Sequence, residues 1–224
     1  MILLSTAYFP PVEYVAVIAD RCRFGSGSSG VEPAAVHIEA CEHYVKQSWR
    51  NRCRFYAADG AQTLNYPVYH EDFGKPISQV RIDWKTDWLT RHERAIVSAY
   101  RTSPYFEYYQ DELFAILDSR PELMLDFNTE ILKFLLRKCG IPAEISFTTE
   151  WTAPDPKLSD GTAASDLREA IHPKRPNTIM KDLGLDRPYW QVFSPKHGFI
   201  PGLSTMDLLF NEGPDSISHL RPSR

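Results

Sequence analysis

The chain of 224 residues lacks the sequence features of a membrane or secreted protein. No run of about 18 apolar residues is present, which is the length that a membrane-spanning helix requires. The first six residues carry no positive charge, and Phe9-Pro10-Pro11 interrupts the apolar start before it reaches signal-peptide length. We therefore expect a cytoplasmic protein without a transmembrane segment.

Cysteine is also scarce, and its spacing excludes two further classes. The four cysteines lie far apart and form no Cys-x-x-Cys pair, so neither a zinc site nor a disulfide framework is predicted. The histidines likewise show no metal-ligand spacing. We expect no metal and no cofactor.

A broad excess of positive charge is absent too. Lys and Arg number 25 against 29 for Asp and Glu, giving a net charge of −4. A nucleic-acid partner is therefore not expected, and any site for an anion must be local. With 43% apolar residues, residues 1–224 can form a single domain with a sizeable core. The sequence does not indicate an oligomeric state.

The pattern of apolar residues predicts an α/β fold. Alternating or short apolar segments indicate strands at residues 2–5, 36–40, 80–84, 144–148 and 189–193. Segments 53–56 and 64–68 flank Asp59-Gly60 as a β-hairpin. Helical periodicity indicates helices at 12–20 and 165–171, about three helices between 86 and 140, and one that begins at a capping box, Ser204–Asp207. We expect a mixed sheet with the segment 86–140 inserted between strands as a helical subdomain.

One glycine-rich segment matches the letters of a dinucleotide-binding turn but not its context. Residues 25–30 read G-x-G-x-x-G. Such a turn must follow a strand and open a helix, whereas this segment follows a helix and leads to Pro33. It is interpreted as a flexible loop.

The strongest candidate site is a basic cluster before the hairpin, which holds Lys46, Gln47, Trp49, Arg50, Asn51 and Arg52. Guanidinium groups match phosphate and carboxylate oxygens, and lysine adds a point charge. If this segment is extended, Arg50 and Arg52 share a face and suit a diphosphate. The alternative is that these cations face solvent or pair with Glu39 or Glu42.

A second candidate is the aromatic-proline loop after the first strand, with Tyr8, Phe9, Pro10 and, on the following helix, Tyr14. Open α/β sheets bind ligands beyond the carboxyl ends of their strands, so these four side chains are candidate ligand contacts. The alternative is that the loop only packs beneath the helix.

His92 and Glu42 are the candidate acid–base residues. Imidazole titrates near neutrality, and His92 lies on a helical stripe with Trp88 and Tyr100. Glu42 lies close in sequence to the basic cluster. The alternative for His92 is a hydrogen-bonded core residue.

Taken together, several motifs resemble the WbqC-like protein family, in the same order over nearly the whole chain. They are residues 7–11 with Tyr14, 46–52, 67–68, the stripe from Trp88 through 103–106, 166–168, 189–193 and 204–214. Relatives often carry Gln-Pro ahead of the aromatic-proline loop, where this chain has Ser5-Thr6. The resemblance implies a role in bacterial surface polysaccharide, including O-antigen, production.

These observations lead to a functional hypothesis with one main alternative. The protein is expected to be a transferase that binds a sugar nucleotide or another phosphorylated donor through Lys46, Arg50 and Arg52, with His92 or Glu42 moving a proton. Alternatively, it is a non-catalytic ligand-binding or assembly factor for glycan synthesis.

Overall fold

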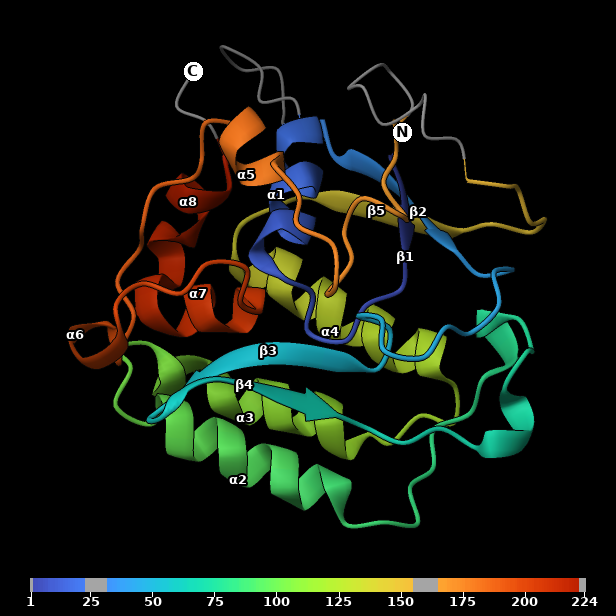
Figure 1. The fold of residues 1–224 in the computed structure, drawn as a ribbon, viewed down its shortest axis with the longest axis horizontal. Coiled ribbons are helices and arrows are strands. Elements are labelled where there is room, and N and C mark those ends of the chain that lie inside the picture. Colours follow the sequence, from blue (N-terminus) through green and yellow to red (C-terminus); the bar gives the residue numbers. More distant parts are fainter. Residues whose placement is uncertain (1, 23–31, 155–164, 222–224) are drawn as a thin grey trace.

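A computed structural model describes residues 2–22, 32–154 and 165–221 of the chain (Figure 1). Within these ranges, no helix combines the length and the apolar character that a bilayer span requires. The glycine-rich segment 25–30 lies outside the described residues, so the structure does not test its interpretation as a loop.

The central element is a four-stranded, entirely parallel sheet with the strand order β5-β2-β1-β6. The strands are β1 Ile2–Ser5, β2 Ala34–Glu39, β5 Ala143–Phe147 and β6 Ser165–Asp166. Ile2 pairs with Val36 on one side and with Ser165 on the other. The apolar residues of β1 and β2 are buried, as expected for inner strands of a parallel sheet.

Helix α1, Val12–Arg21, connects β1 to β2 and is enclosed by other elements. Every residue from Val12 to Ala19 is buried, because α1 contacts both β2 and the C-terminal helices α7, Thr205–Glu212, and α8, Ser216–Leu220. One acidic residue, Glu13, is among those buried.

The hairpin forms a separate antiparallel pair, β3 Arg52–Ala57 and β4 Gly60–Asn65. Gly60 has a φ of +111° at the turn, a conformation that favours glycine. The second strand begins at Gly60 and ends before Pro67, so it is shifted toward the turn relative to the predicted segment 64–68.

Three helices follow the hairpin, as predicted: α2 Trp88–Tyr100, α3 Phe106–Asp118 and α4 Met124–Lys138. Gly140, just beyond α4, has a φ of +70° and ends this helix. In Figure 1 the hairpin crosses the molecule between the parallel sheet and helices α2 and α3. The Tyr100 hydroxyl of α2 lies 3.2 Å from the Tyr56 amide, which donates to it. The α/β class with a hairpin and an inserted helical segment is confirmed, and parallel and antiparallel pairing are divided between two sheets.

The remaining elements are short. They are the helices α5 Ile179–Asp182 and α6 Ser194–His197, and the 3-10 helices η1 His70–Asp72, η2 Ile77–Gln79 and η4 Gly213–Asp215. Ser204 caps α7 as predicted, because its Oγ accepts a hydrogen bond from the Met206 amide at 3.1 Å. Asp207 does not complete a capping box. Its carboxylate instead accepts hydrogen bonds from Tyr100, Tyr189 and Gln191 in the core.

Three predicted elements are wrong. Residues 80–84 form only isolated bridges, at Arg81 and Ile82, because the Arg81 amide donates to the Asp72 carboxylate instead of a strand. Residues 165–171 are not helical, since Ser165 and Asp166 pair with β1.

The third wrong element is the strand at 189–193, whose alternation has a different cause. Tyr189 and Gln191 are both buried, and both donate hydrogen bonds to Asp207. No neighbouring strand pairs with this segment among the described residues. The alternating pattern of this segment therefore marks side chains that face the core, and its backbone does not pair with a strand.

Candidate functional site

The parallel sheet changes its direction of winding at β1. The chain proceeds from β1 to β2 and β5 on one side and then returns to place β6 on the other side of β1. Open α/β sheets bind ligands beyond the carboxyl ends of the strands at such a position. A small cavity of about 20 Å³ lies there, and its wall includes Ser5, Thr6, Trp49, Arg50, Arg168 and His172.

Arg50, which lines this cavity, forms an ion pair with Glu42. Arg50 Nε lies 3.0 Å from Glu42 Oε1, and its Nη2 lies 2.7 Å from Glu42 Oε2. Ser5 Oγ joins them, donating to Glu42 at 3.1 Å and accepting from Arg50 at 3.0 Å. The side chains of Arg50 and Glu42 are each about one-tenth exposed. The predicted alternative, in which a cation of the cluster pairs with Glu42, therefore holds for Arg50.

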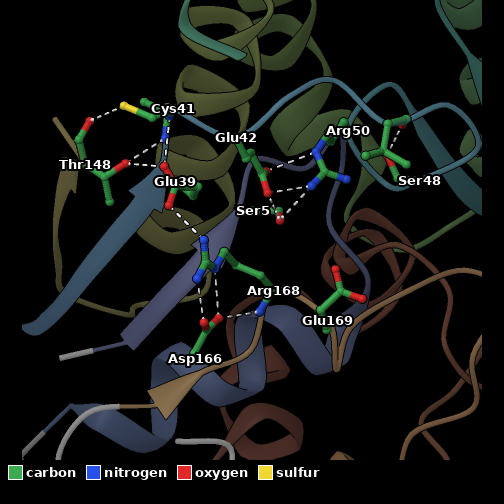
Figure 2. Close-up of polar contacts among 12 residues, drawn as sticks. Ser5, Glu39, Cys41, Glu42, Ser48, Arg50, Thr148, Asp166, Arg168 and Glu169 are labelled. Carbon is green, nitrogen blue, oxygen red and sulfur yellow. Dashed lines mark hydrogen bonds and ion pairs between the residues drawn. The ribbon is translucent and has the colours of Figure 1, made fainter. Parts of the chain in front are cut away.

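A second, more deeply buried pair faces it (Figure 2). Arg168 Nη1 lies 2.8 Å from Glu39 Oε2, and its Nη2 lies 2.6 Å from Asp166 Oδ2. The hydrogen bonds from Arg168 to Asp166 raise the pKa of this guanidinium. The other oxygen of Glu39 accepts from Thr148 Oγ1 at 2.6 Å. These carboxylates hold the strand ends together and are themselves fully engaged.

A larger cleft of about 630 Å³ adjoins the small cavity, because Trp49 and His172 line both. Four cations border this cleft, namely Arg54 of β3, Lys174, Arg175 and Lys181, against the two acids Glu13 and Asp186. Arg175 pairs with the exposed Glu169 at 2.6 Å, and Lys174 contacts Gln47. Arg54 is half-buried and forms no ion pair within the described residues, but its charge acts on the nearby Glu13 carboxyl. The cleft thus has a local excess of positive charge.

His172 is the imidazole at the junction of the two cavities. Burial and the neighbouring Arg175 lower its pKa, so the neutral form predominates near pH 7. Its Nδ1 accepts a hydrogen bond from the Lys174 amide at 3.2 Å. The proton of the neutral ring is therefore on Nε2, which is available as a donor.

A model of the WbqC-like protein family matches residues 34–219. The chain belongs to the WbqC-like protein family. It is also 27% identical over 200 residues to the uncharacterized protein Rv1507c of Mycobacterium tuberculosis, covering 81% of this chain and 85% of that protein. No solved structure matches the chain.

The two segments that carry the predicted contacts of this WbqC-like protein do meet. The Tyr8 amide donates to the Trp49 carbonyl at 2.9 Å. The side chains of Tyr8 and Phe9 nevertheless point into the core and are fully buried, and Phe9 has a φ of +42°, which is rare for a bulky residue. The Pro10 carbonyl oxygen accepts hydrogen bonds from the amide and the hydroxyl group of Thr205. The packing alternative therefore describes Tyr8, Phe9 and Pro10, whereas Tyr14 borders the small cavity and donates to the Ser5 carbonyl at 2.9 Å.

The basic cluster disperses in the folded chain. Lys46 Nζ stacks 4.1 Å above the centre of the Phe73 ring, and Asn51 donates to the Tyr66 carbonyl at 2.7 Å. Arg50 lies in a turn before the hairpin and Arg52 begins β3, so the extended geometry that would align these two arginines is absent. Only Trp49 and Arg50 of the cluster line the cavities.

His92 lies among aromatic rings beneath the hairpin and does not line either cavity. Its Nδ1 lies 2.9 Å from the Tyr8 hydroxyl, and its Nε2 lies 3.1 Å from the Asn65 carbonyl. Because a carbonyl only accepts, Nε2 carries the proton and Nδ1 accepts from Tyr8. Burial lowers the pKa of His92 to about 4. These contacts are those of a hydrogen-bonded core residue, which was the alternative interpretation of His92.

The structure brings in residues that the sequence analysis did not single out. Arg54, Lys174 and His172 reach the cleft from segments more than 100 positions apart, and Glu13 reaches it from the first turn of α1. The run His172-Pro173-Lys174-Arg175-Pro176 was the available signal, since basic residues held between prolines indicate a fixed loop. No group of His, Cys, Asp or Glu in the described ranges is arranged to hold a metal ion.

Proposed function

We propose that this protein binds a sugar nucleotide, or a similar phosphorylated donor, in the basic cleft and acts as a cytoplasmic transferase in bacterial surface polysaccharide production. The observation that carries the proposal is the excess of cations around a cleft of about 630 Å³ beside the carboxyl ends of β1 and β6. Because the net charge of the chain is −4, this excess is a local property.

The cleft is matched to a phosphate group in two respects. Arg54 supplies a guanidinium that forms no ion pair within the described residues, although its charge acts on the nearby Glu13 carboxyl. Lys174 and Lys181 add exposed ammonium groups. A phosphate can accept charge-assisted hydrogen bonds from all of these groups. The neutral His172 adds an Nε2–H donor that can stabilise charge on the leaving group of a transfer reaction.

A specific observation favours the non-catalytic alternative. Glu42, the predicted carboxylate base, is held by Arg50 and Ser5, and Glu39 is held by Arg168 and Thr148. Neither carboxylate can take a proton from the hydroxyl group of a saccharide acceptor unless a buried ion pair breaks. A ligand-binding or assembly factor for glycan synthesis would need only the recognition chemistry of the cleft.

Binding is tested by calorimetric titration with uridine, thymidine and guanosine diphosphates and their sugars. We expect one nucleotide series to bind, and Arg54→Gln and Lys174→Gln each to weaken it about tenfold, or ~1.4 kcal/mol. The matched control is Arg101→Gln, which removes an exposed cation at the end of α2 outside the cleft. If no nucleotide binds, or if all three variants behave alike, the proposal is wrong.

Turnover separates the two functions. A transferase should release the nucleoside diphosphate when a saccharide acceptor is present, and His172→Asn should slow that release more than it weakens binding. Tight binding with no product by mass spectrometry would support the alternative. Deletion of the gene should alter the electrophoretic pattern of the surface polysaccharide in either case.

A further inference from the structure

A second, largely apolar chamber opens beside the basic cleft. It has a volume of about 100 Å³, and its wall includes Val12, Leu185, Tyr189 and Phe199. An engineered apolar cavity of roughly 150 Å³ accommodates benzene, so this chamber can take part of a six-membered ring. The rings of Tyr189 and Phe199 meet edge to face, with their centres 5.2 Å apart.

Glu13 stands at the junction of the chamber and the cleft. It borders both, together with Met180, Asp186, Pro201 and Gly202. A Cβ placed on Gly202 would lie 3.8 Å and 4.0 Å from the two carboxylate oxygens of Glu13. The carboxylate end of the side chain, not only its stem, therefore lies against the shared rim.

The carboxylate of Glu13 is buried without a cation bound to it. The residue is 8% exposed, and no ion pair of the described residues involves it. Burial raises the pKa of Glu13, and this effect outweighs the interactions of the carboxyl with the Asn177 side chain and with the charge of Arg54, both of which lower the pKa. Part of its stabilisation comes from the first turn of α1, where an acidic residue interacts favourably with the helix dipole. A buried carboxylate that is not paired is costly, which distinguishes Glu13 from Glu39 and Glu42.

The surroundings restrict what Glu13 can bind. A cationic ligand would meet Arg54 and Lys181 in the cleft and Arg187 at the chamber. An anionic group would be repelled by Glu13 itself. An uncharged ligand that offers hydroxyl donors avoids both costs, because a carboxylate accepts two or more hydrogen bonds.

We propose that Glu13 and the adjoining chamber form a second subsite, which binds an uncharged pyranose ring. The hydroxyl edge of the ring donates to Glu13, while its C–H face packs on the aromatic wall at Tyr189 and Phe199. The subsite deepens the proposed function, on which it rests, since it places a sugar next to the phosphate-binding cleft. The sugar is either the glycosyl part of the donor or a separate acceptor.

Saturation-transfer NMR with 4-nitrophenyl glycosides of glucose, galactose and N-acetylglucosamine tests the subsite. In parallel, calorimetry compares each nucleoside diphosphate with its sugar derivative. We expect Glu13→Gln to weaken binding of the sugar-containing ligand at least tenfold and not to weaken binding of the unglycosylated nucleotide, because the variant removes a negative charge from the cleft. Glu107→Gln is the matched control, because it makes the same change at an exposed first-turn acid of α3 that lines neither cavity, and it should leave the binding of both ligands unchanged.

The NMR and calorimetry results distinguish a donor sugar from an acceptor sugar. They also separate the subsite from the proposed function. Glu13-dependent binding of a free glycoside indicates an acceptor, and Glu13-dependent preference for the sugar nucleotide over the bare nucleotide indicates the donor. Glycoside binding without nucleotide binding would remove the proposed function and leave the subsite standing. If neither sugar-containing ligand depends on Glu13, the subsite is wrong. Should Glu13→Gln lower the melting temperature, Phe199→Leu tests the aromatic wall, with the same tenfold loss expected.

Discussion

Arg168 reaches across the carboxyl end of β1 to form an ion pair with Glu39 at 2.8 Å, although 129 positions separate the two residues. Since β1 lies between β2 and β6, this pair joins the strands on either side of it. The same guanidinium binds Asp166 on β6. A buried electrostatic bridge thus joins the strand ends (Figure 2), and its Arg168 lines the small cavity.

Replacing Arg168 should strongly destabilise the protein. Arg168→Met leaves Glu39 and Asp166 as buried carboxylates without their cation, and breaking such a pair costs about 3–5 kcal/mol. Lys133→Met is the control, because its partner Glu130 is half exposed and the pair is on the surface, where such pairs contribute about 1 kcal/mol or less. Urea unfolding measures both. Equal, small losses would show that the bridge contributes little.

His92 should make stability depend on pH. The folded protein protonates this imidazole only near pH 4, whereas the unfolded chain does so near 6.5. Between these values the unfolded state binds more protons, so the free energy of unfolding falls as the pH is lowered from about 6.5 to 4. The contribution is on the order of 3 kcal/mol.

The variant His92→Gln isolates this contribution, because glutamine keeps a donor and an acceptor but does not titrate. We expect the stability advantage of the wild-type protein over His92→Gln to shrink between pH 7 and pH 4, measured by urea unfolding at each pH. A constant difference across this range would contradict the burial of a neutral His92.

The contribution of Asp207 to stability should depend on pH in the opposite direction to that of His92. Burial raises its pKa to about 6, even though hydrogen bonds from Tyr189, Tyr100 and Gln191 lower it. Between about pH 6 and the ordinary value near 3.8, the folded state binds more protons, so this carboxyl adds stability as the pH falls. The deficit of Asp207→Asn relative to the wild-type protein should therefore widen from pH 7 to pH 4 in the same unfolding series. A deficit that narrows would show that the carboxylate is stabilised as an anion.

Gly213 should tolerate no side chain. A Cβ at this position would lie 2.4 Å from the Tyr105 ring, and such overpacking costs about 1–3 kcal/mol in addition to the strain of its φ of +54°. Gly74→Ala is the control, since Gly74 also has a positive φ but no atom within 4 Å of the place that an added methyl group would occupy. Thermal unfolding should show a larger loss for Gly213→Ala, and equal losses would contradict the contact.

The sequence predicts the elements whose signals are local. Asp59-Gly60 marks the hairpin, Gly140 marks the end of α4, and the apolar stripe of Trp88, Ile96 and Tyr100 marks α2, whose residues are buried as expected. Each signal lies within a few positions of the structure it specifies. The strand at 189–193 shows the limit, because alternation there reflects contacts with a single carboxylate on α7.

The candidate site was less predictable, because contacts between residues distant in sequence determine which side chains line it. Arg50 looked like a ligand contact in the sequence, but its partner Glu42 and the Ser5 hydroxyl engage it. Arg54 lies on the same strand as Arg52, yet it borders the cleft only because residues 172–176 pack opposite it. Glu13 resembles an ordinary first-turn acid until the fold encloses it.

The position of β6 has a consequence for how the protein is made. Strand β1 obtains its second neighbour only when Ser165 and Asp166 have been synthesised. Contacts so distant in sequence form slowly, since a long loop must close first. A nascent chain that has completed its hairpin and its three inserted helices still has no cleft. The candidate cleft can therefore form only late in biosynthesis, since residues 172–178, 201 and 202 are part of its wall.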